Sequence, residues 1–231
     1  MSKNDQYRQL IDDVRTAYRS AQRELKWCDE CQEINLWTYW QGRGHLDARI
    51  MLVGQDWGCP WDAGAAEVMR NVQAMNRGQS IGYMRENKNP TDRNLIELFR
   101  SIGFDILTDD SRLFFTNFVM GYRVKGTSGN FKKSWAAADA EYFRRLVKII
   151  RPRILLCLGK DTWKSVLGCF DSTISHKMSY NRVIESEKNP VVVKLSDGMP
   201  VYVFALAHCG VMGTLNPVSY THLRAHETRS N

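Results

Sequence analysis

Residues 48–61, ARIMLVGQDWGCPW, begin as a short apolar run and then change abruptly to glycine and polar side chains. The run from Ala48 to Val53 has the length and the continuous hydrophobicity of a strand that is buried on both faces. Gly54, Gln55 and Asp56 follow it directly. We therefore expect a buried strand that delivers an amide and a carboxylate to the turn after it.

Three further apolar runs occur later in the chain: Leu113 to Thr116, Ile154 to Leu158 and Val201 to Ala207. Helical patterns lie between the runs, because apolar residues at 143, 146, 147 and 150 predict a helix that ends at the RPR sequence of residues 151–153. A similar pattern predicts a first helix over residues 10–25. Strands that alternate with helices predict an α/β fold, with a mainly parallel four-stranded sheet flanked by helices on both faces.

Polar residues or glycine follow each predicted strand. The first strand leads to Gln55 and Asp56, the second to Asn117, the third to Gly159 and Lys160, and the fourth to His208. The carboxyl ends of parallel strands meet at one edge of a sheet, where open α/β sheets bind their ligands. A carboxylate, an amide and an imidazole that converge in this way predict a functional site at that edge.

Length and composition favour one domain, residues 1–217, because 231 residues with 43% hydrophobic content can bury a full core. The net charge of +7 favours an anionic partner, with nucleic acid ahead of a membrane. The chain has no run of 18 apolar residues, and its start lacks the apolar centre of a signal peptide. We therefore expect a soluble, cytoplasmic protein, and a monomer.

Cys28 and Cys31 are the one C-x-x-C pair in the sequence. Such a pair supplies half of a tetrahedral zinc site, and no second pair completes the ligand set. We therefore expect reduced thiols, with no metal and no cofactor. A metal-dependent module that uses this pair stays open as an alternative.

The end of the chain has an unusual composition. Residues 218–228, VSYTHLRAHET, resemble the translation of a transposase-type sequencing adaptor. We expect residues 218–231 not to be native, so that the natural sequence differs beyond about Pro217, and we leave them out of the reasoning on fold and function.

A series of motifs resembles those of the uracil-DNA glycosylase superfamily, in the same order along the chain. These are GQDWG at 54–58, GQSIGY at 78–83, NPTDRNL at 89–95, LFFTN at 113–117, RPRILLCLG at 151–159 and HCGVM at 208–212. The resemblance implies a uracil-DNA glycosylase-like fold and a DNA glycosylase of base excision repair. Such an enzyme flips a uracil or a related damaged pyrimidine out of single- or double-stranded DNA and hydrolyses its N-glycosidic bond, which leaves an abasic site.

The resemblance also implies a role for each matched residue. Asp56 would orient a water molecule and stabilise the cationic sugar, while His208, as a neutral imidazole, would donate to the uracil oxygen as the base leaves. Asn117 would accept from uracil N3–H and donate to O4, a pattern that cytosine reverses. The remaining matches are the substrate-binding residues Gly54, Gln55, Gly58 and Tyr83, and the DNA contacts Pro90, Thr91, Gly159, Lys160, Gly210 and Met212, the last as an apolar wedge.

The chain departs from the family pattern at several positions. Gly58 stands where classical members have the tyrosine that excludes the thymine methyl group, so the choice between uracil and thymine stays open. Gly121 stands where an iron-sulfur branch of the family has its third cysteine, so we expect no cluster. Cys209 and Gly210 replace a proline and a serine.

Two readings compete with the glycosylase. The first is a non-catalytic nucleic-acid-binding protein of the same fold, and the second is an unrelated α/β enzyme. Arg123 and Lys125, which follow the second predicted strand, are candidates for phosphate contacts in either nucleic-acid reading.

Overall fold

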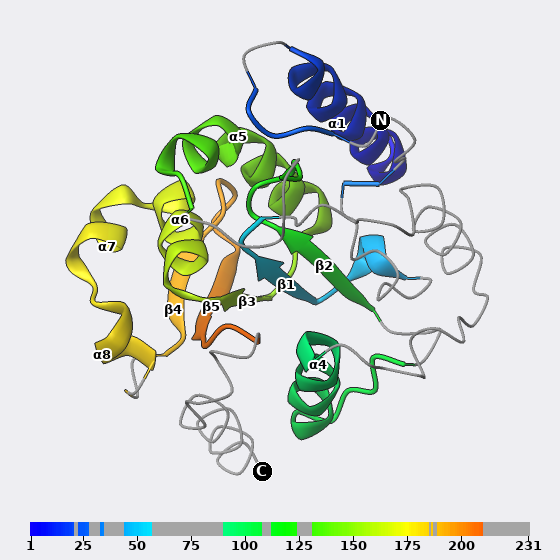
Figure 1. Ribbon diagram of the computed structural model, residues 1–231. Coiled ribbons are helices and arrows are strands. Elements are labelled where there is room, and N and C mark those ends of the chain that lie inside the picture. The colour runs from blue at the N-terminus through cyan, green and yellow to red at the C-terminus, as the bar shows by residue number, and fades with distance from the viewer. Residues whose placement is uncertain are drawn as a thin grey trace.

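The computed structural model describes residues 1–20, 23–27, 33–34, 44–56, 90–107, 112–123, 131–184, 186 and 189–209. Within these ranges the chain forms a five-stranded sheet in the order β2-β1-β3-β5-β4, flanked by helices (Figure 1). The strands are β1 (Ile50–Gly54), β2 (Leu113–Asn117), β3 (Ile154–Leu158), β4 (Val191–Lys194) and β5 (Pro200–Leu206). Neighbouring strands are parallel except β4, which runs antiparallel to β5. The predicted α/β class with a mainly parallel sheet is confirmed.

The predicted number of strands is wrong, because the sequence reasoning missed β4. This strand is the hairpin partner of β5, and the two join through a turn in which Leu195 N donates to Met199 O at 2.9 Å. Side chains along β4 alternate between buried and exposed, since they face the core and solvent in turn. β4 has only three consecutive apolar residues, the valines of VVVK, and so short a run was not recognised as a strand.

Six helices and one short 3-10 helix accompany the sheet in the described ranges. They are α1 (Lys3–Arg19), the 3-10 helix His45–Asp47, α4 (Pro90–Ser101), α5 (Lys133–Ile150), α6 (Lys160–Phe170), α7 (Ser172–Lys177) and α8 (Tyr180–Ile184). A capping box starts α1, because Ser2 and Asp5 each accept from the backbone N–H of the other. The helix ends at Arg19, before the end at residue 25 that the sequence predicted. The predicted end of α5 before RPR is confirmed.

Helices cover both faces of the sheet, as predicted. On one face α1, α5 and α6 pack against strand residues such as Val53 and Cys157, while α4 packs on the other face against residues such as Leu52 and Phe115 (Figure 1). Burial on both sides explains why all five residues of β1 and of β2 are buried. The polar residues at the carboxyl ends of these strands therefore lie at the margin of the buried core.

Candidate functional site

The carboxyl ends of β2, β1, β3 and β5 lie next to one another and form what we call the carboxyl edge. Gly54 at the end of β1 pairs with Asn117 at the end of β2, and Leu158 pairs with Leu206. Backbone hydrogen bonds continue beyond these pairs, since Phe118 N donates to Gly54 O at 2.9 Å. The structure thus brings the residues that follow four separate strands to one edge.

Asp56 forms an ion pair with Arg123 at this edge. Nε of Arg123 lies 2.7 Å and Nη2 lies 2.6 Å from Oδ2 of Asp56. Only 10% of the Asp56 side chain and 11% of the Arg123 side chain are exposed. Burial raises the pKa of Asp56 above its ordinary value, while the hydrogen bond and charge of Arg123, and the charge of His208, oppose that rise. Arg123, expected from the sequence to contact phosphate, is instead the partner of this carboxylate.

Asn117 carries a buried side-chain amide without partners. The residue is 1% exposed, and neither its Nδ2 nor its Oδ1 has a hydrogen bond. Asn189, the other buried asparagine in the described ranges, is fully paired, because it donates to Ala205 O and accepts from Ala205 N, both at 3.0 Å. An unpaired buried donor or acceptor costs about 1–3 kcal/mol, so the amide of Asn117 calls for a ligand that would pair with it.

His208 and Gly159 lie together on the β3 and β5 side of the carboxyl edge. Gly159 has φ 87, and a Cβ built there would lie 4.0 Å from Cδ2 of His208. His208 retains exposed surface, and yet burial by the surrounding protein lowers the pKa of its imidazole, against the charge of Asp56. The ring is therefore neutral at pH 7. The charges of the two predicted catalytic groups, Asp56 and His208, affect each other's pKa.

The segment after His208 is attached to α4. Asn94 Nδ2 donates to the backbone oxygen of Cys209 at 2.8 Å, and Cys209 itself is buried. Pro90 and Thr91 form the first turn of α4, where proline is favoured because its missing N–H has no partner in a helix. The NPTDRNL motif therefore begins a helix here, with the expected DNA contacts Pro90 and Thr91 in its first turn.

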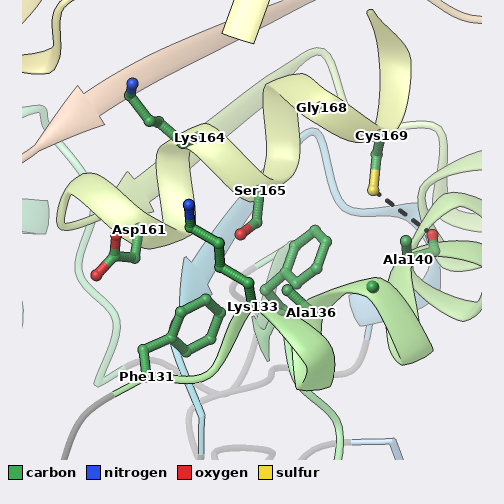
Figure 2. A pocket seen from close by; sticks show the side chains of 11 residues that line it. Phe131, Lys133, Ala136, Ala140, Asp161, Lys164, Ser165, Gly168 and Cys169 are labelled. Carbon is green, nitrogen blue, oxygen red and sulfur yellow. Dashed lines mark hydrogen bonds between the residues drawn. The ribbon is translucent and has the colours of Figure 1, made fainter. Parts of the chain in front are cut away.

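Lys160, the first residue of α6, is exposed and stands beside Gly159, the N-cap. A pocket of about 450 Å³ lies nearby between α5 and α6, where Lys133, Asp161 and Lys164 surround apolar walls (Figure 2). None of the predicted site residues lines this pocket, although Phe118, which does, follows Asn117 in the chain. We therefore assign the site to the carboxyl edge.

Several predicted residues fall outside the described ranges. They are Gly58, Tyr83, Gly210 and Met212, together with Cys28, Cys31, Lys125 and the tail of residues 218–231. Within those ranges, no group of three histidine, cysteine, aspartate or glutamate side chains could hold a metal ion. Cys157, Cys169 and Cys209 are buried free thiols.

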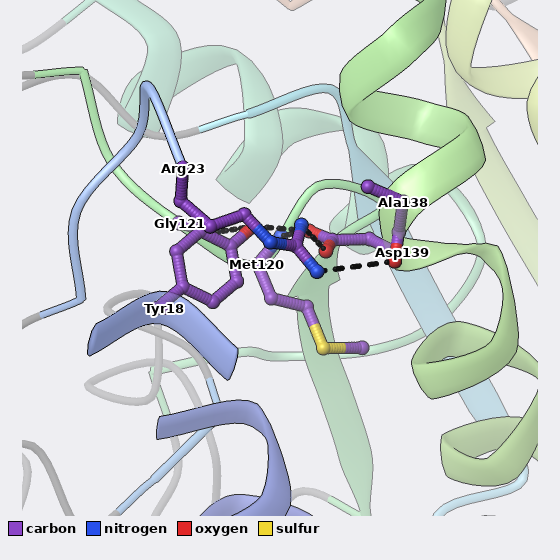
Figure 3. Close-up of polar contacts among 6 residues, drawn as sticks. All are labelled: Tyr18, Arg23, Met120, Gly121, Ala138 and Asp139. Atoms are coloured by element: carbon purple, nitrogen blue, oxygen red, sulfur yellow. Dashed lines mark hydrogen bonds and ion pairs between the residues drawn. The ribbon is translucent and has the colours of Figure 1, made fainter. Parts of the chain in front are cut away.

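The sequence did not indicate the residues that hold the loop after β2, which are Tyr18 in α1 and Asp139 in α5. The backbone of this loop is held by a buried network in which Asp139 Oδ2 accepts from Met120 N at 2.8 Å and also from the hydroxyl of Tyr18 (Figure 3). The same hydroxyl accepts from Gly121 N at 2.9 Å. Tyr18 lies 103 positions from Gly121 and 121 positions from Asp139, and nothing in the sequence links them, so the network could be found only from the fold.

No protein-family model matches the chain, and no curated protein matches it. No helix in the described part of the chain is both long enough and apolar enough to span a membrane. The motifs and the geometry of the carboxyl edge are therefore the features that indicate a function.

Proposed function

We propose that this protein is a DNA glycosylase that hydrolyses the N-glycosidic bond of a flipped uracil or related damaged pyrimidine and leaves an abasic site. The observation that carries the proposal is the unpaired, buried amide of Asn117, on the same edge as Asp56 and His208. The motif order of a uracil-DNA glycosylase-like fold supports it.

The amide of Asn117 has the hydrogen-bonding groups that uracil requires. Its Oδ1 can accept from uracil N3–H, and its Nδ2 can donate to O4. Cytosine presents an acceptor at N3 and a donor at position 4, so both groups of a fixed amide would face the wrong partner. A buried site that leaves polar groups unpaired with the wrong substrate discriminates strongly against it.

Cleavage of the glycosidic bond places positive charge on the sugar and negative charge on the departing base. Asp56 supplies a carboxylate that stabilises the sugar cation and holds the attacking water. The bond from C1′ to the base breaks, the water oxygen bonds to C1′, and the proton that the water loses is balanced by the one that the departing base anion takes up. His208, neutral because the pKa of its imidazole is lowered, donates a hydrogen bond to the carbonyl oxygen of the leaving base. The products are a free base and an abasic sugar, and the reaction needs no cofactor.

A non-catalytic nucleic-acid-binding protein of the same fold is the alternative. The net charge of +7 and the exposed Lys160 beside the carboxyl edge suit it equally well. It gives no reason, however, for an ionisable pair of aspartate and histidine beside an unpaired amide. The glycosylase accounts for all three groups.

The test is alkali-revealed cleavage of labelled oligonucleotides that carry one uracil opposite guanine, opposite adenine or in a single strand. Thymine opposite guanine is included because Gly58 leaves its exclusion open. We expect cleavage at uracil, and a rate lowered roughly 10²–10⁴-fold in Asp56→Asn.

The matched control is Asp197→Asn, which makes the same chemical change in another aspartate that pairs with an arginine, Arg151. Asp197 lies in the turn before β5, at the end of the sheet opposite to the carboxyl edge. Its variant should retain the full rate. A folded protein that binds DNA in a salt-dependent way but never cuts at uracil would favour the non-catalytic alternative.

A further inference from the structure

The ion pair of Asp56 with Arg123 involves only one of the two carboxylate oxygens, Oδ2. Both Nε and Nη2 of Arg123 approach Oδ2, at 2.7 and 2.6 Å, and no hydrogen bond in the described part of the chain reaches Oδ1. Arginine often pairs with a carboxylate through two parallel hydrogen bonds that occupy both oxygens. Here the arrangement holds the carboxylate while one oxygen stays open to another partner.

Arg123 is itself restrained from several sides. Its guanidinium lies over the ring of Trp135, 5.0 Å from the centroid, and Trp135 Nε1 donates to Glu24 at 3.1 Å. A cation over an indole face is attracted to it, so this contact favours the observed position of the guanidinium. The side chain is therefore directed at Asp56 by packing as well as by charge.

The backbone that leads to Arg123 is also fixed. Met120 N and Gly121 N donate to Asp139 and Tyr18, respectively (Figure 3). Tyr122 exchanges two backbone hydrogen bonds with Lys26. A Cβ on Gly121 would collide with the ring of Tyr18, so this passage admits only glycine without movement. Arg123 thus starts from a defined point beside the carboxyl edge.

We propose that Arg123 is a positioning residue for Asp56: it binds Oδ2, keeps the carboxylate ionised in its buried position, and presents Oδ1 to the attacking water. The inference rests on the proposed glycosylase function, since it assigns the oxygen that acts in that reaction. It differs from a phosphate-contact role, in which Arg123 would act on DNA directly. It also differs from a purely structural role, in which the pair would only stabilise the fold.

The charged or titratable groups that act on Asp56 in the described ranges are Arg123, from the loop after β2, and His208, from the segment after β5. Loss of the arginine charge would raise the pKa of Asp56. The less ionised carboxylate would then lower the pKa of His208 further, because Asp56 acts on that imidazole in the opposite direction. The acid limb of the pH–rate profile is the range in which the excision rate falls as the pH is lowered. A shift of this limb to higher pH therefore reports the pKa of Asp56 and not that of His208.

The experiment measures single-turnover excision of uracil from pH 4 to 9 by the full chain and by Arg123→Gln and Arg123→Lys. Loss of an opposite charge at this distance raises the pKa of a carboxyl group by about 1–3. We therefore expect the acid limb of Arg123→Gln to move up by about that amount, and Arg123→Lys to restore part of it. Arg151→Gln, which breaks the surface pair with Asp197, is the matched control and should leave the profile in place.

A second readout does not depend on activity. The side-chain carboxyl carbon of Asp56, labelled with ¹³C and assigned by comparison with Asp56→Asn, should titrate at higher pH in Arg123→Gln than in the natural sequence. If Arg123→Gln does not fold, Arg123→Lys carries both measurements, with a smaller shift. If the Arg123 variants are active but their acid limb and their Asp56 carboxyl titration match those of the natural sequence, this inference is wrong and the proposed glycosylase function is retained. Protein that is inactive on uracil but shows the carboxyl shift would instead reject the glycosylase and keep only the ion pair.

Discussion

Replacement of Asn117 by leucine should stabilise the protein while it abolishes excision of uracil. The amide has two unpaired groups and is 1% exposed, so the folded state bears a desolvation cost of about 1–3 kcal/mol for each group. Leucine has the same branching at Cγ but is larger, and overpacking of a core costs about 1–3 kcal/mol. For two unpaired groups, the middle of these ranges leaves a gain of about 2 kcal/mol in the free energy of unfolding.

For a domain of this size, that gain corresponds to a rise in Tm of roughly 4–8 °C. Thermal unfolding of Asn117→Leu beside the natural sequence measures it, and the oligonucleotide assay should show a loss of at least roughly 100-fold in the rate. A more stable and less active variant is the expected signature of a site that bears a cost in stability for its function.

Asn189→Leu is the matched control for this prediction. Its amide is also buried, but it donates to and accepts from the backbone of Ala205, so its removal should lower the free energy of unfolding. Equal destabilisation by the two variants would refute the reasoning, because it would mean that the amide of Asn117 is paired in the free protein.

Three further predictions follow from the packing and the titrating groups. Gly121→Ala should lower the free energy of unfolding by about 1–3 kcal/mol in urea titrations, because the new Cβ meets the ring of Tyr18; unchanged stability would contradict that contact. The rate of excision should stay level between pH 7 and 8, because the pKa of His208 is lowered and the imidazole has lost its proton below that range; a titration within it would assign His208 a higher pKa. Cys157 should not react with a thiol reagent until the protein unfolds, because burial raises the pKa of its thiol; rapid modification of the native chain at this cysteine, located by mass spectrometry, would oppose this.

Sequence patterns predicted β1, β2 and β3 well because nearly all of their residues are buried, and they predicted β5 from its apolar run. A continuous apolar run such as IMLV in β1 is typical of a strand that is buried on both faces. The residues after each run then followed from the topology rule alone, which brought Asp56, Asn117 and His208 to one edge. The strand β4 was missed because its apolar run of three valines is short, although Asp197 and Gly198 form a pair typical of hairpin turns.

The partner of Asp56 could not be predicted in the same way. Arg123 lies 67 positions from Asp56, and its approach depends on the path of the loop after β2. That path depends in turn on Tyr18 and Asp139, which belong to two different helices. A basic residue near the end of a strand suits phosphate or carboxylate equally well, so only tertiary structure could separate the two.

The strand order also sets when the carboxyl edge can assemble as the chain is made. Asp56 and Asn117 leave the ribosome early and lie on strands that pair with each other, but His208 follows β5, which inserts between β3 and β4. Until β5 has emerged, one side of β3 is an unpaired apolar edge of the kind that invites aggregation. A chain that stops before residue 208 therefore lacks both the last member of the site and the strand that closes the sheet beside it.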